Sequence, residues 1–377
     1  MKVKLGDVCD KGSSNLKQSD VINQNGQYPV YGAAGLLGNI DSYHQDKPYV
    51  AVVKDGAGIG RVTLQPGYSS VIGTLQYLLP KENVLPEYLY YVTKHMHLEK
   101  YYTGATIPHI YFKDYKNEKF NLDAIEKQQR IVDILKKIEN IIESRQQELQ
   151  KLDDLIRARF VEMFGDNQEV HKLSDIAAIT GGLTKNSRRD KLELRKPYLR
   201  VANVFFASID TTEILDIGLT KEEYEKTLLR NGDLLFVEGN GSPDQIGRVA
   251  IWNGEIEDCV HQNHLIKARF DLKRMNPVFA MYYFISERGR NQIKKRAVST
   301  SGLYTLSVSK IADFEIPNPP MELQQQFAAF VAAIDKSKLL SGCRLFHSWA
   351  PENRDKPKHV GVPRRETKDL RGGRRQQ

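Results

Sequence analysis

Residues 123–165 read "DAIEKQQRIVDILKKIENIIESRQQELQKLDDLIRARFVEMFG". The stretch has no proline, and its only glycine is its last residue. Apolar residues recur at alternating spacings of four and three, interrupted only by Arg145 and Arg159: Ile131, Leu135, Ile138, Ile142, Leu149, Leu152, Ile156 and Met163. This heptad seam predicts a coiled-coil-forming helix of about 42 residues, or about 63 Å. A domain of about 120 residues is too small to cover so long a stripe, which favours a partner helix over packing on its own domain.

The sequence on either side of this helix is repeated. "VVKDGAGIGRV" (52–62) and "FVEGNGSPDQIGRV" (236–249) each run from an apolar strand through a glycine-rich turn to Ile-Gly-Arg-Val. Further matches follow in the same order: "KLGDV" (4–8) with "KLSDI" (172–176), Tyr90–Tyr91 with Tyr282–Tyr283, and "EKQQRIVDIL" (126–135) with "ELQQQFAAFV" (322–331). The order indicates duplication of one domain-plus-helix unit.

The second copy of the helix is shorter than the repeat predicts. Phe327, Val331 and Ile334 keep the seam register, but Lys338 occupies the next seam position and the pattern stops. The following residues are polar, basic and rich in glycine and proline, which predicts disorder. One explanation is a frameshift beginning near Leu340.

These patterns predict an α+β chain with two tandem mixed α/β domains separated by long coiled-coil-forming helices. The expected parts are a first domain (1–122), a long heptad helix as spacer (123–165), a second domain (166–318), a shortened second spacer helix (319–340) and a disordered basic tail (341–377). Loss of half of the second helix would expose part of the first helix's seam, which favours a homodimer.

Composition narrows the class of protein. The net charge is +8, but the last 37 residues hold 10 Lys/Arg against 4 Asp/Glu, so the rest of the chain is nearly neutral and a nucleic-acid argument needs local patches. Three distant cysteines, Cys9, Cys259 and Cys343, argue against a disulfide framework or a zinc site. The sequence has no apolar leader and no 18-residue apolar run, so we expect a cytoplasmic protein.

The glycine-rich turns do not match a nucleotide-binding loop. A dinucleotide fingerprint needs a third glycine where this chain has Arg61, and the residues after it have the composition of strands rather than a helix. A Walker Gly-Lys-Ser/Thr sequence is also missing. The sequence therefore does not predict that these turns bind a nucleotide.

Two variable domains, each followed by a heptad helix that opens with Glu-x-Gln-Gln, resemble the specificity (S) subunit of type I restriction-modification systems, here with a truncated or frameshifted C-terminus. The resemblance covers residues 1 to about 338 and includes "IPNPPMELQQQF" (316–327). It implies that each domain is a target-recognition domain that reads one half of a bipartite site on double-stranded DNA.

The resemblance also implies the partners. The two helices would pack antiparallel, hold the domains at a fixed separation and dock two modification (methyltransferase) subunits, joined by a restriction/translocase subunit. S-adenosylmethionine, ATP and magnesium would belong to those partners. The chain itself would have no cofactor, no metal and no catalytic residue.

Candidate DNA-binding residues lie in the turns and in the later repeated segment. Glycine lets the backbone approach a duplex closely, Asn and Gln can pair with adenine, and Arg can bind guanine or phosphate. The candidates are Lys54, Arg61, Thr106, His109, Tyr111, Asn240, Ser242, Gln245, Arg248, Ser299, Thr300, Ser301 and Tyr304. The basic run "RGRNQIKKR" (288–296) suits a phosphate-facing helix.

Three alternatives remain open. Asn318–Pro319–Pro320 resembles the Asn-Pro-Pro-aromatic loop of an autonomous DNA methyltransferase, but Met321 stands where an aromatic residue would stack on a flipped base, and the prolines suit a helix start. A coiled-coil scaffold that does not read DNA would fit the nearly neutral body. An inactive frameshifted specificity subunit would fit the tail.

Overall fold

The computed structural model describes residues 1–340 except 23, 105–106, 166–168 and 301. The predicted tail, 341–377, lies outside the described residues. The chain forms two compact units, Met1–Ser144 and the residues from Arg145 on, and the boundary falls within helix α4 (Ile125–Phe164). Each unit has its own apolar core.

The first unit contains a four-stranded antiparallel sheet with the order β2-β8-β5-β6. Its inner strand β5 (Tyr49–Val53) is buried along its whole length. The other strands are β1 (Lys2–Lys4), β2 (Cys9–Ser13), β3 (Tyr28–Gly32), β4 (Gly35–Ile40), β6 (Val62–Gln65), β7 (Ser70–Val71), β8 (Leu75–Pro80) and β9 (Lys119–Asn121). The helices before α4 are α1 (Leu5–Val8), α2 (Pro86–His95) and α3 (Phe112–Tyr115), with a 3-10 turn at η2 (Leu98–Tyr101).

The second unit contains a four-stranded antiparallel sheet with the order β11-β18-β14-β16. Its inner strand β14 (Asp233–Val237) is also buried throughout. The other strands are β10 (Val170–Lys172), β11 (Ala177–Gly181), β12 (Arg195–Leu199), β13 (Leu215–Gly218), β15 (Gly239–Asn240), β16 (Val249–Trp252), β17 (Val260–His261), β18 (Leu265–Phe270), β19 (Val298–Thr300), β20 (Leu303–Thr305) and β21 (Glu315–Pro317). The helices are α5 (Lys221–Thr227), α6 (Pro277–Ile285), α7 (Glu287–Arg296), α8 (Val308–Ala312) and α9 (Met321–Leu340).

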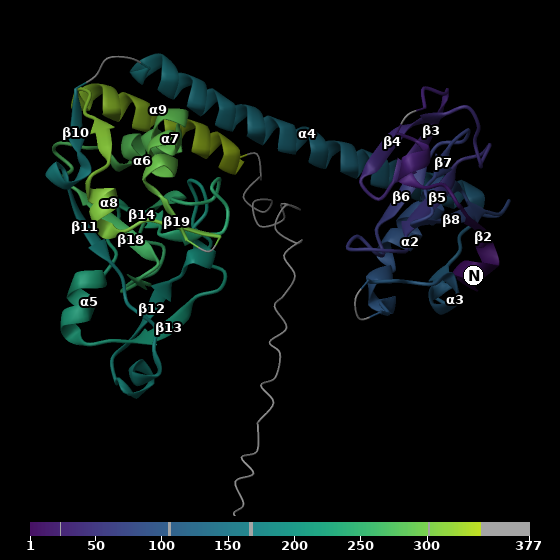
Figure 1. Cartoon of the computed structure of the whole chain (residues 1–377), viewed down its shortest axis with the longest axis horizontal. Helices are drawn as coiled ribbons and strands as arrows, with labels where there is room; N and C mark the ends of the chain where they lie inside the picture. Colours follow the sequence, from purple (N-terminus) through teal and green to yellow (C-terminus); the bar gives the residue numbers. More distant parts are fainter. Residues whose placement is uncertain (23, 105–106, 166–168, 301, 341–377) are drawn as a thin grey trace, which may run out of the picture. The chain divides into compact units, whose positions relative to one another are not determined.

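The two units repeat one topology, which confirms the duplication predicted from the sequence. Three sheets correspond in strand order: β2-β8-β5-β6 with β11-β18-β14-β16, β4-β3-β7 with β13-β12-β17, and β1-β9 with β10-β21. The second pair of sheets even shares its one parallel contact, β3 with β7 and β12 with β17. Figure 1 shows both units as mixtures of strands and helices.

The repeated Glu-x-Gln-Gln segments anchor the start of each spacer helix. Gln128 accepts a hydrogen bond from the backbone N–H of Leu85, and Gln324 accepts one from that of Asn276. Both glutamines are fully buried, and each bonded N–H belongs to the residue before a proline that begins α2 or α6. These helix starts align Tyr91 with Tyr282, so the tyrosine match made from sequence is displaced by one residue.

The Asn-Pro-Pro segment is part of the same anchor. The Gln324 side-chain amide donates to the Pro319 carbonyl at 2.8 Å and to Asn318 Oδ1 at 3.3 Å, and α9 begins directly afterwards. This arrangement supports the reading of Asn318–Pro320 as a helix start.

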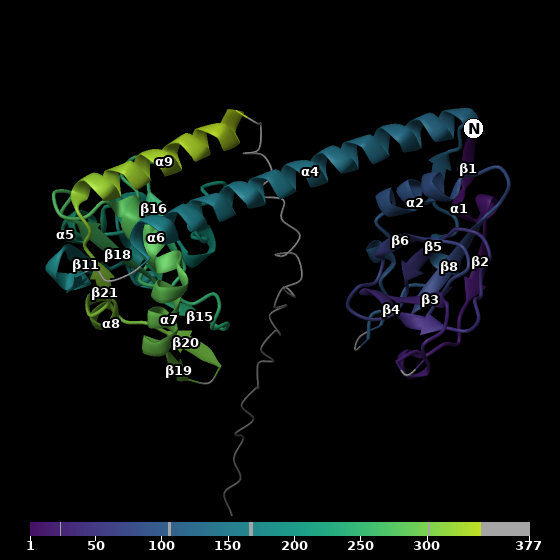
Figure 2. The same cartoon turned by 90° about the horizontal axis from the view of Figure 1, so that it is seen from above.

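In the second unit, α4 and α9 pack antiparallel (Figures 1 and 2). Phe327, near the start of α9, contacts Phe160 and Phe164, near the end of α4. At the other end of α9, Lys338 Nζ lies 2.7 Å from Asp153 Oδ1. The charged seam position therefore has a charged partner, Asp153, whose side chain is itself 41% exposed.

The predicted seam is covered only in part. Ile156, Phe327 and Val331 are buried, and Leu149, Leu152 and Ile334 are partly buried. In the first unit, Ile131 packs on the domain core, Leu135 and Ile142 are partly buried, and Ile138 is 46% exposed. The seam is thus closed where α9 lies beside α4 and where Ile131 packs on the first core, and it is open at Ile138.

Candidate nucleic-acid interface

The two Ile-Gly-Arg-Val segments form the same hairpin. In the first unit, Gly60 N–H donates to the Val53 carbonyl, and Val53 N–H donates to the Arg61 carbonyl, both at 2.9 Å. In the second unit, Gly247 N–H donates to Val237 at 3.1 Å, and Val237 N–H donates to Arg248 at 2.9 Å. Each glycine-rich turn is therefore held at the end of a buried strand of the large sheet.

The last glycine of each turn serves internal packing. Gly60 and Gly247 have φ values of +80° and +62°. A Cβ at position 60 would lie 2.5 Å from the backbone nitrogen of Glu99 in η2, and one at position 247 would lie 2.6 Å from Ile293 of α7. Glycine is required here by conformation and by close packing.

The earlier glycines of the turns are different, because their surroundings are open. A Cβ on Gly56 would meet no atom within 4 Å, and one on Gly58, Gly239 or Gly241 would meet none closer than 3.6 Å. These four positions expose backbone that a duplex can approach.

The two repeated arginines brace the turns. Arg61 donates to the Ala33 carbonyl at 3.0 Å, and Arg248 donates to the Val201 carbonyl at 3.3 Å. The accepting residues follow the corresponding strands β3 and β12. Arg248 also lies over the Phe205 ring at 5.6 Å and donates to Gln245 at 3.4 Å, and burial lowers the pKa of its guanidinium. DNA contact by either arginine stays a prediction, beside a bracing role that sequence reasoning missed.

In the first unit, side chains connect the turn to the later candidate segment. His109 Nδ1 lies 2.5 Å from Asp55 Oδ1, and Lys54 Nζ lies 3.6 Å from Asp55 Oδ2. Backbone bonds join the same segments, from Gly56 N–H to Pro108 and from Ile110 N–H to Lys54. Lys54 and His109 are thus brought together through Asp55.

Tyr111 extends this first-domain surface. Its ring is 49% exposed and lies nearly parallel to that of His109, with centroids 6.2 Å apart. An exposed aromatic face beside an imidazole suits stacking or groove contact. Thr106 lies outside the described residues.

In the second unit, a small sheet connects the corresponding segments. Strands β15, β20 and β19 place Asn240 and Ser299 on either side of Tyr304. Asn240 Oδ1 accepts from Ser242 N–H at 2.9 Å, and Ser242 Oγ accepts from Asp244 N–H at 3.3 Å, so both side chains also shape the turn. Thr300 lies in β19, whereas Ser301 lies outside the described residues.

Arg290 and Lys294 of α7 complete the second turn, and the sequence did not single them out from the basic run. Arg290 donates to the carbonyls of Gly247 and Asp244 at 3.1 and 3.2 Å and lies over the Phe206 ring at 5.1 Å. Lys294 Nζ lies 2.7 Å from Asp244 Oδ1, and this hydrogen bond lowers the pKa of the Asp244 carboxyl.

The described residues contain neither a metal-binding cluster nor a membrane-spanning helix. Among the residues that the structure describes, no cluster of His, Cys, Asp and Glu is arranged to hold a metal ion. None of the described helices combines the length and the apolar character needed to cross a bilayer.

Comparison with known proteins gives a consistent result. The family model described as "Type I restriction modification DNA specificity domain" matches residues 1–154 and again 165–342. The type I restriction enzyme MjaIX specificity subunit of Methanocaldococcus jannaschii is 25% identical over 313 residues, covering 75% of this chain and 67% of that protein. A second protein of that organism, named after the restriction enzyme MjaX, is 30% identical over 175 residues, but the match covers 45% of this chain and only 40% of the relative.

A solved structure supports the fold. The S subunit of a type I restriction-modification system from M. genitalium superposes with a TM-score of 0.55 at 17% identity, covering 92% of this chain and 94% of that one.

Proposed function

The chain belongs to the family of type I restriction-modification DNA specificity proteins, and from that premise we propose that it is the specificity subunit of such a complex. Each of its two domains reads one half of a split site on double-stranded DNA. The observation that carries this proposal is the repeated hairpin, which presents open glycines at the end of a buried strand in both domains.

The two glycine-rich turns and their neighbouring segments are the proposed DNA-reading surfaces. The first consists of Lys54, His109 and Tyr111 around the turn at Gly56, and the second of Asn240, Ser299 and Tyr304 around the turn at Gly241. Side chains that reach base edges carry sequence information, whereas lysine, arginine and backbone N–H groups hold phosphates. The first surface carries a lysine, Lys54, that can hold a phosphate, and the second carries an amide, Asn240, that can read a base.

Chemistry is proposed to reside on partner subunits. We assign methyl transfer and S-adenosylmethionine to modification subunits, and ATP and magnesium to a restriction/translocase subunit. The chain would direct these partners without a catalytic residue or cofactor of its own. Because its proposed ligand is DNA inside the cell, we expect the protein in the cytoplasm.

We also propose that an exposed stripe of α4, formed by the seam residue Ile138 and the neighbouring Ile134 and Ile141, pairs with a second copy of the chain. Ile134, Ile138 and Ile141 are 57%, 46% and 62% exposed. On another side of α4, Lys136 and Glu139 bond Glu87 and Lys94 of α2, so these two polar residues face the domain while the three isoleucines are exposed. Two antiparallel copies would present this stripe to itself in an isologous contact.

Sedimentation tests the dimer. The full chain should sediment as a dimer, and Ile138→Glu should convert it to a monomer. Gln146→Glu adds the same charge at an exposed polar position of α4 and should leave the dimer intact. A wild-type monomer at micromolar concentration would rule out this pairing.

Methylome sequencing tests the main proposal. A strain carrying this gene together with neighbouring modification and restriction genes should methylate one asymmetric motif split by a fixed spacer. A gel shift at increasing salt distinguishes a DNA-binding subunit from a coiled-coil scaffold. The DNA-binding chain should lose affinity steeply as salt rises, whereas the scaffold should show no binding. A continuous motif, or no DNA binding, contradicts the proposal.

A further inference from the structure

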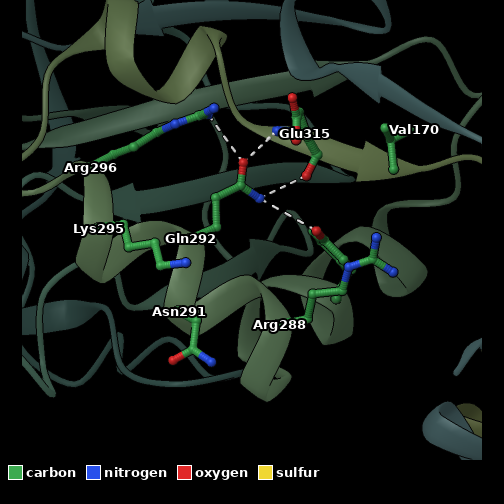
Figure 3. A pocket seen from close by; sticks show the side chains of 8 residues that line it. Val170, Arg288, Asn291, Gln292, Lys295, Arg296 and Glu315 are labelled. Atoms are coloured by element: carbon green, nitrogen blue, oxygen red, sulfur yellow. Dashed lines mark hydrogen bonds between the residues drawn. The ribbon is translucent and has the colours of Figure 1, made fainter. Parts of the chain in front are cut away.

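Helix α7 has two basic flanks: the cations of one bond the protein's own groups, whereas the other carries two cations, Arg288 and Lys295, for which no side-chain hydrogen bond or ion pair is found among the described residues. At 100° per residue, Arg290 and Lys294 share one flank, which bonds the turn at Asp244 and Gly247. The opposite flank lines a pocket of about 440 Å³ (Figure 3). Its lining residues are Val170, Tyr283, Arg288, Asn291, Gln292, Lys295, Arg296 and Glu315.

Gln292 fixes the walls of this pocket. Its amide donates to the Glu315 carbonyl at 2.8 Å and to the Tyr283 hydroxyl at 3.4 Å, while its oxygen accepts from Glu315 N–H at 2.6 Å. Arg296 donates to the same oxygen at 3.1 Å and lies over the Phe314 ring. Helix α7 is therefore clamped to β21, and the pocket between them is preformed.

Besides Arg296, the pocket lining contains two cationic side chains, Arg288 and Lys295. Arg288 and Lys295 are exposed, and among the described residues neither makes an ion pair or a side-chain hydrogen bond. The one carboxylate in the lining, that of Glu315, points away from both in Figure 3. Asn291 adds an exposed amide beside them. Two available cations and an amide in a preformed concavity are suited to an anion.

Among the described residues of the first domain, the lysine at the corresponding place is paired. There η2 takes the position of α7, and Lys100 pairs with Glu118. Tyr101 donates to the same carboxylate at 2.5 Å, and these two hydrogen bonds lower the pKa of Glu118. The unpaired basic flank is a property of the second domain.

We propose that this pocket, here called the α7 pocket, holds a phosphate of the DNA backbone beside the half-site read by the second domain. The inference rests on the proposed function and deepens it. Arg288 supplies the planar fork that matches phosphate oxygens, and Lys295 supplies a compact second charge. Lys295 lies three residues before Val298 of β19, so the pocket adjoins the proposed reading surface along the chain.

Contacts to phosphates position a protein on the duplex but carry no direct sequence information. The proposed contact would therefore raise affinity without changing the sequence that is read.

The test is the salt dependence of binding by the full chain to a random-sequence duplex. Arg288→Gln combined with Lys295→Gln should weaken binding about tenfold at moderate salt and make the slope of log K against log salt less steep by about one. Lys221→Gln combined with Lys273→Gln removes two exposed charges elsewhere in the same domain and should leave the slope as in the wild type.

The outcomes distinguish a failure of the α7 pocket proposal from a failure of the proposed function. Wild-type binding with an unchanged slope in the Arg288/Lys295 variant overturns the α7 pocket proposal and leaves the proposed function standing. An unchanged slope with loss of a co-purifying modification subunit also overturns it, because the pocket would then receive an acidic protein surface. Absence of salt-dependent binding by the wild type overturns both.

Discussion

The two domains share a core but differ at the rim of the glycine-rich turn. In the first domain the turn is joined to the later segment by the Asp55–His109 side-chain pair. Both domains also join these segments through the backbone, from Gly56 N–H to Pro108 in the first and by pairing of Asn240 with Tyr304 in the second, where α7 closes the far side. Residues that recur in both copies, such as Gly60 with Gly247 and Gln128 with Gln324, maintain the fold, whereas the non-repeated rim residues are where the two specificities can differ.

The largest expected effect compares the two packed glycines. Gly60→Ala would place Cβ 2.5 Å from backbone, whereas Gly247→Ala would meet side chains only among its nearest atoms, Ile293 Cγ2 at 2.6 Å and Leu306 Cδ1 at 3.2 Å, and both positions have positive φ. We expect Gly60→Ala to lower the free energy of unfolding of the first domain by about 4 kcal/mol, and Gly247→Ala that of the second by about 2 kcal/mol. Domain-resolved hydrogen exchange measures both.

Gly56→Ala is the matched control for the packed glycines. It has a positive φ of 91° but open surroundings, so only the backbone strain, about 1–2 kcal/mol, should remain. Equal losses at Gly56 and Gly60 would mean that packing against η2 contributes nothing.

Between pH 6.5 and 4, a pH titration should affect the second domain more than the first. His261 is fully buried, and burial lowers its pKa from 6.5 to about 4. The unfolded chain therefore binds a proton between these pH values that the folded chain does not, so stability falls as the pH falls from 6.5 to 4, by about 3 kcal/mol in total. Thermal unfolding of each domain across this range is the measurement.

The first domain supplies the control for this titration. The residue that takes the place of His261 there is Val71, which pairs in parallel with β3 as His261 pairs with β12. His261→Val should remove the acid sensitivity. An equally steep loss of stability in His261→Val would assign the effect to other groups.

Arg248 and Arg61 should differ in how much they stabilise their turns, and this difference is smaller than that between the two packed glycines. Arg248 stacks on Phe205 and bonds Val201, whereas Arg61 is exposed and bonds only Ala33 among the described residues. We expect Arg248→Ala to destabilise its turn by about 1.5 kcal/mol and Arg61→Ala by about 0.5 kcal/mol. Exchange rates of the Gly247 and Gly60 amides give the two values. A larger effect at Arg61 would reverse this order.

A small effect, comparable with that of Arg61→Ala, concerns the pair of Asp55 with His109. Asp55 and His109 are partly exposed, so Asp55→Ala should loosen the first turn by only about 0.5–1 kcal/mol, an effect that added salt reduces. Exchange of the Gly56 amide, which donates to Pro108, measures the opening. An effect that salt does not change would mean that Asp55 acts by packing rather than by charge.

The repeated elements could be predicted from the sequence, because repetition itself is the signal. The ordered matches predicted the common topology, and the heptad pattern predicted α4 and α9. The roles of the turn residues could not be predicted, since an Ile-Gly-Arg-Val segment looks the same whether Arg248 contacts DNA or braces Val201. The partner of Lys338 was also hidden, because Asp153 lies far away in sequence.

The roles of the basic residues at 288–296 could not be predicted from the sequence either. Composition indicates a cationic helix, but the division into one flank that bonds Asp244 and another that lines the α7 pocket depends on where β21 and the turn lie in space. A side chain's partners are set by tertiary packing, which a single sequence does not display.

The most direct test of two independent reading domains is the methylated motif of turn variants. Asn240→Ala combined with Gln245→Ala should relax or change bases in one half of the split motif and leave the other half and the spacer as in the wild type. Lys54→Ala combined with His109→Ala should affect only the opposite half. Changes in both halves from either variant would contradict the assignment of one half-site to each domain.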